Sequence, residues 1–195
     1  MKGTMMTQIK AKMISIILIS AALTLFLYII LHESGHMIVM LSAGARITEF
    51  SILGAHVSGE GGSYTNISDL WLHANGAFLP LLISYVYLLL YRSGSENSFY
   101  RTFSCFFGLI PAISMIAWII IPFTFISGNA PLNDDVTLFL ENFSHDFSPL
   151  AVSAAAALFM GIGIAIIIRK KVLRNFMEEI KRVRDECISA SGTDR

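Results

Sequence analysis

Charged side chains are scarce in this sequence, and their scarcity argues against a soluble fold. Asp, Glu, Lys and Arg make up 14% of the residues, whereas about a quarter is usual in soluble domains. Hydrophobic residues reach 54%, and the mean hydropathy is +0.65. The 14 basic and 14 acidic residues leave a formal net charge of zero, so nothing indicates a nucleic-acid partner.

Cysteine is also scarce, and it indicates neither a disulfide nor a metal site. Cys105 lies in an apolar run and Cys187 in a charged tail, which is not a metal-ligand spacing. A signal-peptide cleavage site is lacking as well, because the apolar run from Met13 to Leu31 continues to Leu41. That run predicts an uncleaved membrane anchor.

Long apolar runs dominate what is present. A membrane-spanning helix needs about 20 mostly apolar residues, and four stretches meet this length: 13–42, 70–91, 102–126 and 149–168. We therefore predict an all-α polytopic membrane protein with four transmembrane helices. Residues 1–168 form its membrane-embedded domain, and residues 169–195 form a basic, amphipathic cytoplasmic tail.

The basic residues are distributed unevenly between the predicted loops. Of the 14 Lys and Arg residues, all but Arg46 lie before the first span, in the 92–101 loop or after residue 168. Cytoplasmic segments carry the excess of Lys and Arg, so both termini are predicted to be cytoplasmic. The apolar residues of the tail recur at helical spacing, which favours a helix on the anionic inner leaflet; a solvated helix explains the pattern equally well.

The segment between the first two spans has the pattern of a β-hairpin. Residues 47–53 are partly alternating and rich in β-branched and aromatic types, residues 59–63 supply turn chemistry, and residues 64–67 suit a return strand. We therefore predict a small β-hairpin here, and a role in substrate gating for it.

One motif near the end of the first span carries the chemistry. His32 and His36 are four residues apart, so on a helix they share a face and can bind one zinc ion. Glu33 lies about 100° round the helix, where it can take a proton from a water molecule activated by the metal and pass it to the leaving amine. We predict Glu33 as the catalytic base of a zinc metallopeptidase.

Chance does not readily produce this motif. Shuffling the composition gives roughly 0.005 expected occurrences of the pattern. An acidic side chain near the centre of a membrane helix also costs about 2.5–3.5 kcal/mol, which is why such residues are usually functional. The alternative is a buried, hydrogen-bonded polar cluster that binds no metal.

A third protein ligand is expected, because catalytic zinc usually takes three. The 127–148 loop lies on the same side of the predicted membrane as the motif and contains Asp134 and Asp135. We predict Asp134, ahead of Asp135, as that ligand. Asn133 is expected to cap a short helix that follows, and the alternative is that both aspartates only complement its dipole.

Other polar residues have weaker claims to the site. His73 and Asn75 open the second span, and either can polarise a substrate carbonyl or support a metal ligand; solvation by interfacial water explains each of them better. His56 and His145 lie in predicted loops and are expected to be solvated.

The sequence resembles the site-2-protease-like intramembrane metallopeptidases. The resemblance covers roughly residues 14–145. It rests on the His32–His36 motif with Gly35 before its second histidine, the hairpin-like segment, the Asn75–Ala77 entry to the second span, and the distal Pro131–Asp134. Only the first of these motifs is highly specific.

The resemblance implies a function and a ligand set. His32, His36 and Asp134 would bind zinc, Glu33 would be the base, and the substrates would be membrane-embedded proteins or peptides that unwind locally. The sequence departs from the family in two places. Gly76 is followed by Ala77 where the family has proline, which leaves the oxyanion-stabilising residue unassigned. Asp134 is followed by Asp135 where the family favours glycine, which leaves the third ligand open within this aspartate pair. The family's site also lies towards the cytoplasm, whereas the charge distribution places this one outside.

Two other functions compete with proteolysis. One is a non-catalytic regulatory or immunity-type membrane protein that retains the metallopeptidase scaffold. The other is a metal carrier or sensor that uses the motif histidines and Asp134 together with His56, His73 and His145. A further polar span for metal translocation is lacking, which weighs against the carrier.

Overall fold

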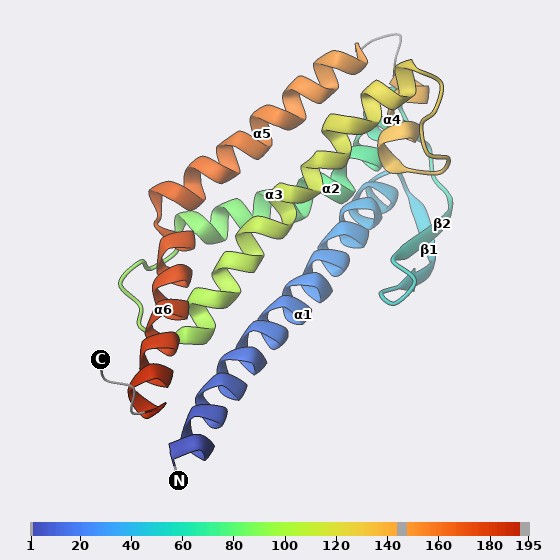
Figure 1. Cartoon of the computed structure of the whole chain (residues 1–195). Coiled ribbons are helices and arrows are strands. Elements are labelled where there is room, and N and C mark those ends of the chain that lie inside the picture. Colours follow the sequence, from blue (N-terminus) through green and yellow to red (C-terminus); the bar gives the residue numbers. More distant parts are fainter. Residues whose placement is uncertain (1, 144–147, 192–195) are drawn as a thin grey trace.

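The computed structural model of the chain describes residues 2–143 and 148–191. Within them the protein is built from six helices and one two-stranded sheet. The four long apolar helices are α1 (Lys2–Ser42), α2 (Asn66–Leu89), α3 (Ser98–Ile126) and α5 (Pro149–Arg169), as Figure 1 shows. All four are long and apolar enough to cross a membrane, which confirms the predicted all-α polytopic fold.

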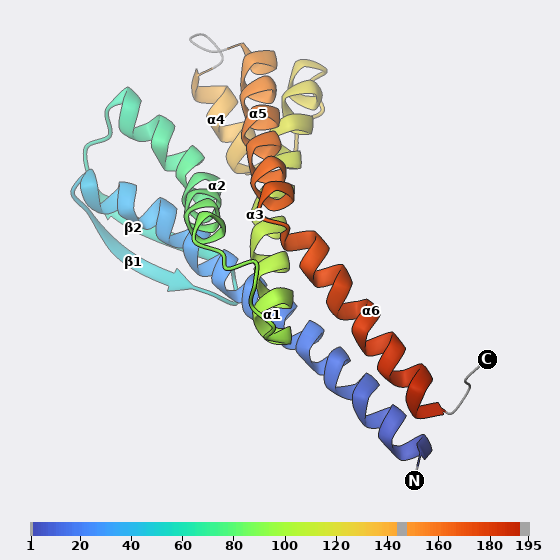
Figure 2. The ribbon, with the colours of Figure 1, turned by 90° about the vertical axis from the view of Figure 1, so that its left-hand side faces the viewer.

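Helix α1 is much longer than the span predicted for residues 13–42. Its 41 residues rise by about 60 Å, roughly twice the hydrocarbon thickness of a bilayer. The N-terminal end of α1 and the C-terminal part of α6 (Val172–Ser191) lie together at one end of the molecule, and α4 (Asp135–Phe143) lies at the other (Figures 1 and 2). The motif histidines are on the α4 side.

The predicted β-hairpin is present, but its turn was placed wrongly. Strands β1 (Ala45–Ser51) and β2 (His56–Gly61) pair antiparallel, and residues 52–55 connect them. Residues 59–63 therefore belong mainly to the return strand instead of the turn. The segment expected to form the return strand instead leads into α2, because Thr65 and Ser68 form a reciprocal capping box that fixes the helix start.

The predicted tail helix is α6, and part of it packs within the chain. Val172, Glu179 and Cys187 are buried on one face, and this face contacts α1 and α3. Leu173 and Met177 remain exposed. An association with the inner leaflet stays a prediction.

A buried carboxylate joins α6 to the start of α3. Glu179 is fully buried; its Oε1 accepts a hydrogen bond from Arg182 at 2.5 Å, and its Oε2 lies 3.6 Å from Nη1 of Arg101. A buried charge is tolerated only when it is paired in this way. The Arg101–Glu179 pair links the tail helix to the start of α3.

Candidate metal centre

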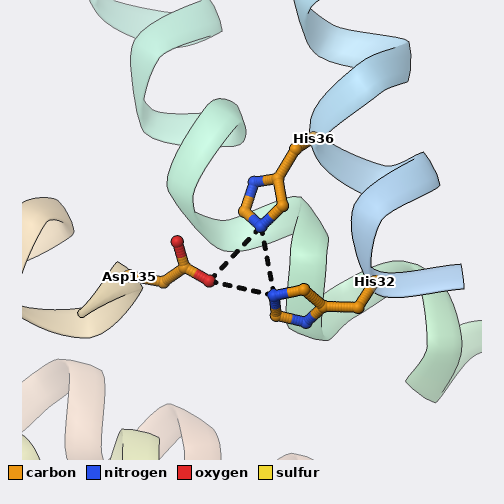
Figure 3. Close-up of side chains that lie close together, drawn as sticks. All are labelled: His32, His36 and Asp135. Atoms are coloured by element: carbon orange, nitrogen blue, oxygen red, sulfur yellow. Dashed lines mark hydrogen bonds and ion pairs between the residues drawn. The ribbon is translucent and has the colours of Figure 1, made fainter. Parts of the chain in front are cut away.

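The two motif histidines meet as their spacing predicts. His32 and His36 project from the same face of α1, and their Nε2 atoms are 3.2 Å apart (Figure 3). The rings are almost perpendicular, with an interplanar angle of 74°. Both imidazoles therefore turn the same nitrogen towards one point.

A carboxylate from a distant part of the chain faces that point. Asp135 is the first residue of α4, and its Oδ2 lies 3.2 Å from His32 Nε2 and 3.3 Å from His36 Nε2. Figure 3 shows the three side chains converging from α1 and α4 beside α2. These three residues form a group whose ligand atoms all lie within 4.8 Å of one another, so they could hold a metal ion.

This geometry corrects the prediction that Asp134, ahead of Asp135, is the third ligand. Asp134 Oδ1 accepts a hydrogen bond from the backbone N–H of Val136 at 2.9 Å, so this side chain caps α4 and turns back on its own backbone. Asn133, which was expected to be the cap, instead has a positive φ of 58°. Asp135, one residue further on, is left to reach the histidines.

A hydrogen bond fixes which nitrogen of His36 carries the proton. Nδ1 lies 2.6 Å from the carbonyl oxygen of Leu72 in α2, and because that oxygen can only accept, Nδ1 must donate. In the neutral ring Nε2 then carries a lone pair. A partner on the remote nitrogen is typical of metal-binding histidines.

The donor set fits a cation. A lone pair on His36 and a carboxylate oxygen lie 3.3 Å apart, which is favourable only if positive charge lies between or on them. One carboxylate with two imidazoles matches the three protein ligands of a catalytic zinc. His32 Nδ1 is buried without a hydrogen-bond partner among the described residues, so its tautomer is free to adjust.

The ionisation of Asp135 suits a ligand role. Burial of this carboxyl disfavours its charged form, but its interactions with the His32 and His36 imidazoles outweigh that effect and hold its pKa well below the usual range. The carboxylate is therefore ionised at neutral pH.

Helix α2 approaches the cluster so closely that only glycine fits at two positions. A Cβ added at Gly76 would overlap His36 Nε2 and lie 2.9 Å from Cε1 of His32. A Cβ added at Gly35 would overlap the carbonyl oxygen of Asn75. Asn75 in turn donates a hydrogen bond to the carbonyl of Gly35 at 2.8 Å, so a glycine on each helix sets the crossing of α1 and α2.

Glu33 lies beside the cluster in the same cavity. Its side chain is buried, with 4% of its surface exposed. The cavity has a volume of about 490 Å³ and is lined by Glu33, the three clustered residues, His73 of α2 and His56 of the hairpin. A carboxylate that is near the cluster but outside it is placed to act on a bound water molecule instead of on the metal.

The other polar residues that the sequence suggested for the site have different surroundings in the structure. Asn75 donates a hydrogen bond to the Gly35 carbonyl and does not line the cavity. His56 is exposed and lies 2.6 Å from the hydroxyl of Ser58 in its own strand. His73 lies 3.3 Å from the side-chain nitrogen of Asn142 in α4. His145 lies outside the described residues.

Together, the fold and the cluster define the class: an α-helical protein with four apolar, potentially membrane-spanning helices and a His–His–Asp group able to hold a metal ion. Comparison with known proteins adds no relative, since no family model, no curated protein and no solved structure matches the chain.

Proposed function

We propose that this protein is a zinc-dependent intramembrane endopeptidase that hydrolyses peptide bonds of membrane-embedded proteins or peptides. The observation that supports this most strongly is the convergence of His32, His36 and Asp135 beside the buried Glu33. Hydrolysis needs a metal site with a free coordination position and a nearby base. Three protein ligands leave such a position.

The residues of the site have different roles in the proposed reaction. A zinc ion held by the cluster would polarise the scissile carbonyl and activate water for attack. Glu33 takes the proton from the attacking water and delivers it to the amide nitrogen as the C–N bond breaks. Leu72 orients His36 through the Nδ1 hydrogen bond, and the glycines at positions 35 and 76 let the helices close round the site.

The location of the site fits a substrate that enters from the membrane. The two histidines of the cluster are in the last third of α1, which is an apolar helix, and residues of the hairpin line one side of the cavity. A membrane-embedded substrate would have to unwind locally there to expose a peptide bond, because a helix satisfies its own backbone groups. With both termini in the cytoplasm, as the basic residues indicate, the site would face the outer half of the bilayer.

Two measurements test this proposal: the zinc content of the purified protein and the cleavage of a membrane-embedded peptide. Purified protein should contain about one zinc per chain, and His36→Ala should lose it. After reconstitution in lipid vesicles with synthetic transmembrane peptides carrying a central Gly-Asn-Gly segment, mass spectrometry should detect cleaved products. Glu33→Gln should abolish cleavage and retain zinc, whereas Glu49→Gln, on the exposed side of the hairpin, should change neither.

Each other outcome rejects the proposal. Zinc-free protein would support the metal-free polar cluster. A physiological effect that survives Glu33→Gln would favour the non-catalytic regulator. Reversible zinc release that depends on His56 would favour the carrier.

A further inference from the structure

The proposed reaction lacks one participant among the residues assigned so far. When water attacks a peptide carbonyl, negative charge develops on the carbonyl oxygen, and a preorganised donor that meets this oxygen contributes strongly to the rate. Asn75 is the obvious candidate by sequence, but it donates to the Gly35 carbonyl and does not line the cavity described above. The candidates for the donor are therefore the side chains that line the cavity.

His73 lines that cavity and lies within hydrogen-bond distance of Asn142, which in turn donates to Asp69. The side-chain nitrogen of Asn142 in α4 lies 3.3 Å from His73 Nε2 and 3.3 Å from Oδ2 of Asp69. Asp69 and His73 are four residues apart on α2, so they share one helix face. The three side chains form a short chain of hydrogen bonds from carboxylate to amide to imidazole.

The direction of this chain determines the tautomer of His73. The Asp69 carboxylate can only accept hydrogen bonds, so the group of Asn142 that faces it is the NH₂ and not the carbonyl oxygen. The second hydrogen of the same NH₂ is then directed to His73 Nε2, which must accept it. In the neutral imidazole Nδ1 carries the proton and is the nitrogen that donates elsewhere.

We propose that His73 is a catalytic residue that donates a hydrogen bond from Nδ1 to the developing oxyanion of the substrate, an inference that rests on the peptidase function proposed above. Asn142 and Asp69 are positioning residues, because they fix the tautomer without touching the substrate. His73 would contact the substrate from α2, where it follows Leu72, the residue whose carbonyl orients His36.

The step balances without a further reactant. The oxygen of water forms a bond to the carbonyl carbon, and its proton goes to Glu33. His73 keeps its own proton and only shares it with the carbonyl oxygen through the hydrogen bond. When the C–N bond breaks, the carbonyl re-forms, and Glu33 returns the proton to the departing amine.

His56 is the matched control, because it is a second histidine lining the same cavity. Its imidazole is exposed on the hairpin, and within residues 2–143 and 148–191 its one hydrogen-bond partner is Ser58, two residues away in the same strand. No residue of another element fixes its tautomer among the described residues. Substituting it removes an imidazole from the cavity and leaves the Asp69–Asn142–His73 chain intact.

The experiment compares His73→Ala, His73→Gln and His56→Ala in zinc-loaded protein reconstituted in vesicles. With the peptide cleaved by the wild type, His73→Ala should lower kcat about 100-fold and leave KM within about twofold. His73→Gln, which restores an N–H donor, should recover part of kcat. His56→Ala should match the wild type, and zinc content should be unchanged in all three variants.

A second readout does not depend on cleavage. N-phosphoryl-Leu-Phe presents a tetrahedral oxyanion, and its dissociation constant is measured by calorimetry. His73→Ala should weaken its binding about 10- to 100-fold, which is the effect expected for one charge-assisted hydrogen bond. Binding to His56→Ala should be unchanged.

The outcomes separate this inference from the proposed function. If Glu33→Gln cleaves like the wild type, the peptidase function fails, and the role of His73 fails with it. If Glu33→Gln is inactive while His73→Ala keeps both kcat and phosphoryl-dipeptide affinity within about threefold, only the role of His73 is overturned. Loss of zinc from His73→Ala overturns it too, because the residue would then support the metal cluster and not the oxyanion.

Discussion

Replacing Gly76 by alanine tests the metal site and the fold separately. The added Cβ would overlap His36 Nε2 and lie 2.7 Å from Cε1 of the same ring. These atoms are at the far end of a side chain, so the ring can escape by rotating. Rotation, however, breaks the hydrogen bond between Nδ1 and the Leu72 carbonyl and carries Nε2 away from Asp135.

The size of the effect follows from the cost of overpacking. Inserting a methyl group into a filled site costs about 1–3 kcal/mol, which corresponds to roughly a 5- to 150-fold loss of affinity if the whole cost falls on the zinc-bound state. In the zinc-free protein the ring is free to turn away, and alanine gains up to about 1 kcal/mol in helix propensity. The free energy of unfolding without zinc should therefore change by less than about 1 kcal/mol.

Gly35→Ala should behave in the opposite way. Its Cβ would overlap the backbone carbonyl oxygen of Asn75, and backbone cannot rotate aside. The crossing of α1 and α2 must open, so the free energy of unfolding should fall by about 1–3 kcal/mol with or without zinc.

The assay is zinc competition with a chromophoric chelator in detergent, combined with denaturant unfolding of the zinc-free protein. Gly161→Ala is the control, because no atom lies within 4 Å of a Cβ added there; it should keep wild-type affinity. Wild-type zinc affinity in Gly76→Ala would refute the inference that both imidazoles bind the metal in the arrangement described.

Two further pairs of variants test neighbouring acidic residues. Asp135→Asn should reduce zinc affinity at least about tenfold, as loss of a charged ligand implies, whereas Asp134→Asn should keep it because asparagine also caps helices; equal losses of bound zinc in a chelator titration would contradict the ligand assignment. Glu179→Gln should lower the free energy of unfolding by about 1.5–3 kcal/mol, since it weakens a charge-assisted bond to Arg182, while Glu178→Gln, which is exposed, should stay within about 0.5 kcal/mol. Equal melting temperatures of these two variants in detergent would show that the buried pair contributes nothing.

The sequence predicted the apolar helices and the paired histidines because both are local patterns. Hydropathy over 20 residues identifies a helix long enough to cross a bilayer, and a four-residue spacing places His32 and His36 on one face. Neither property depends on the rest of the chain. The hairpin was predicted from its residue types, but its turn was misplaced because residues 59–61 of the Gly-rich segment pair with β1.

The third member of the cluster could not be chosen from sequence, because the choice depends on where α4 begins. Asp134 and Asp135 are chemically identical, and a shift of one residue in the cap exchanges their roles. The engagement of Asn75 by Gly35 depends equally on the contact between two helices. The Gly76–Ala77 pair was interpreted only by comparison with the family motif, whereas in the structure the missing side chain at position 76 leaves room for the imidazoles.

The cluster also has an order of assembly. Two of its members lie on α1, and the third, Asp135, follows about a hundred residues later in the chain, after three of the apolar helices have been synthesised. A nascent chain that has inserted only α1 and α2 has both imidazoles but lacks the Asp135 carboxylate. The group that could hold a metal ion is therefore incomplete in such a chain, and it forms only once α4 has docked.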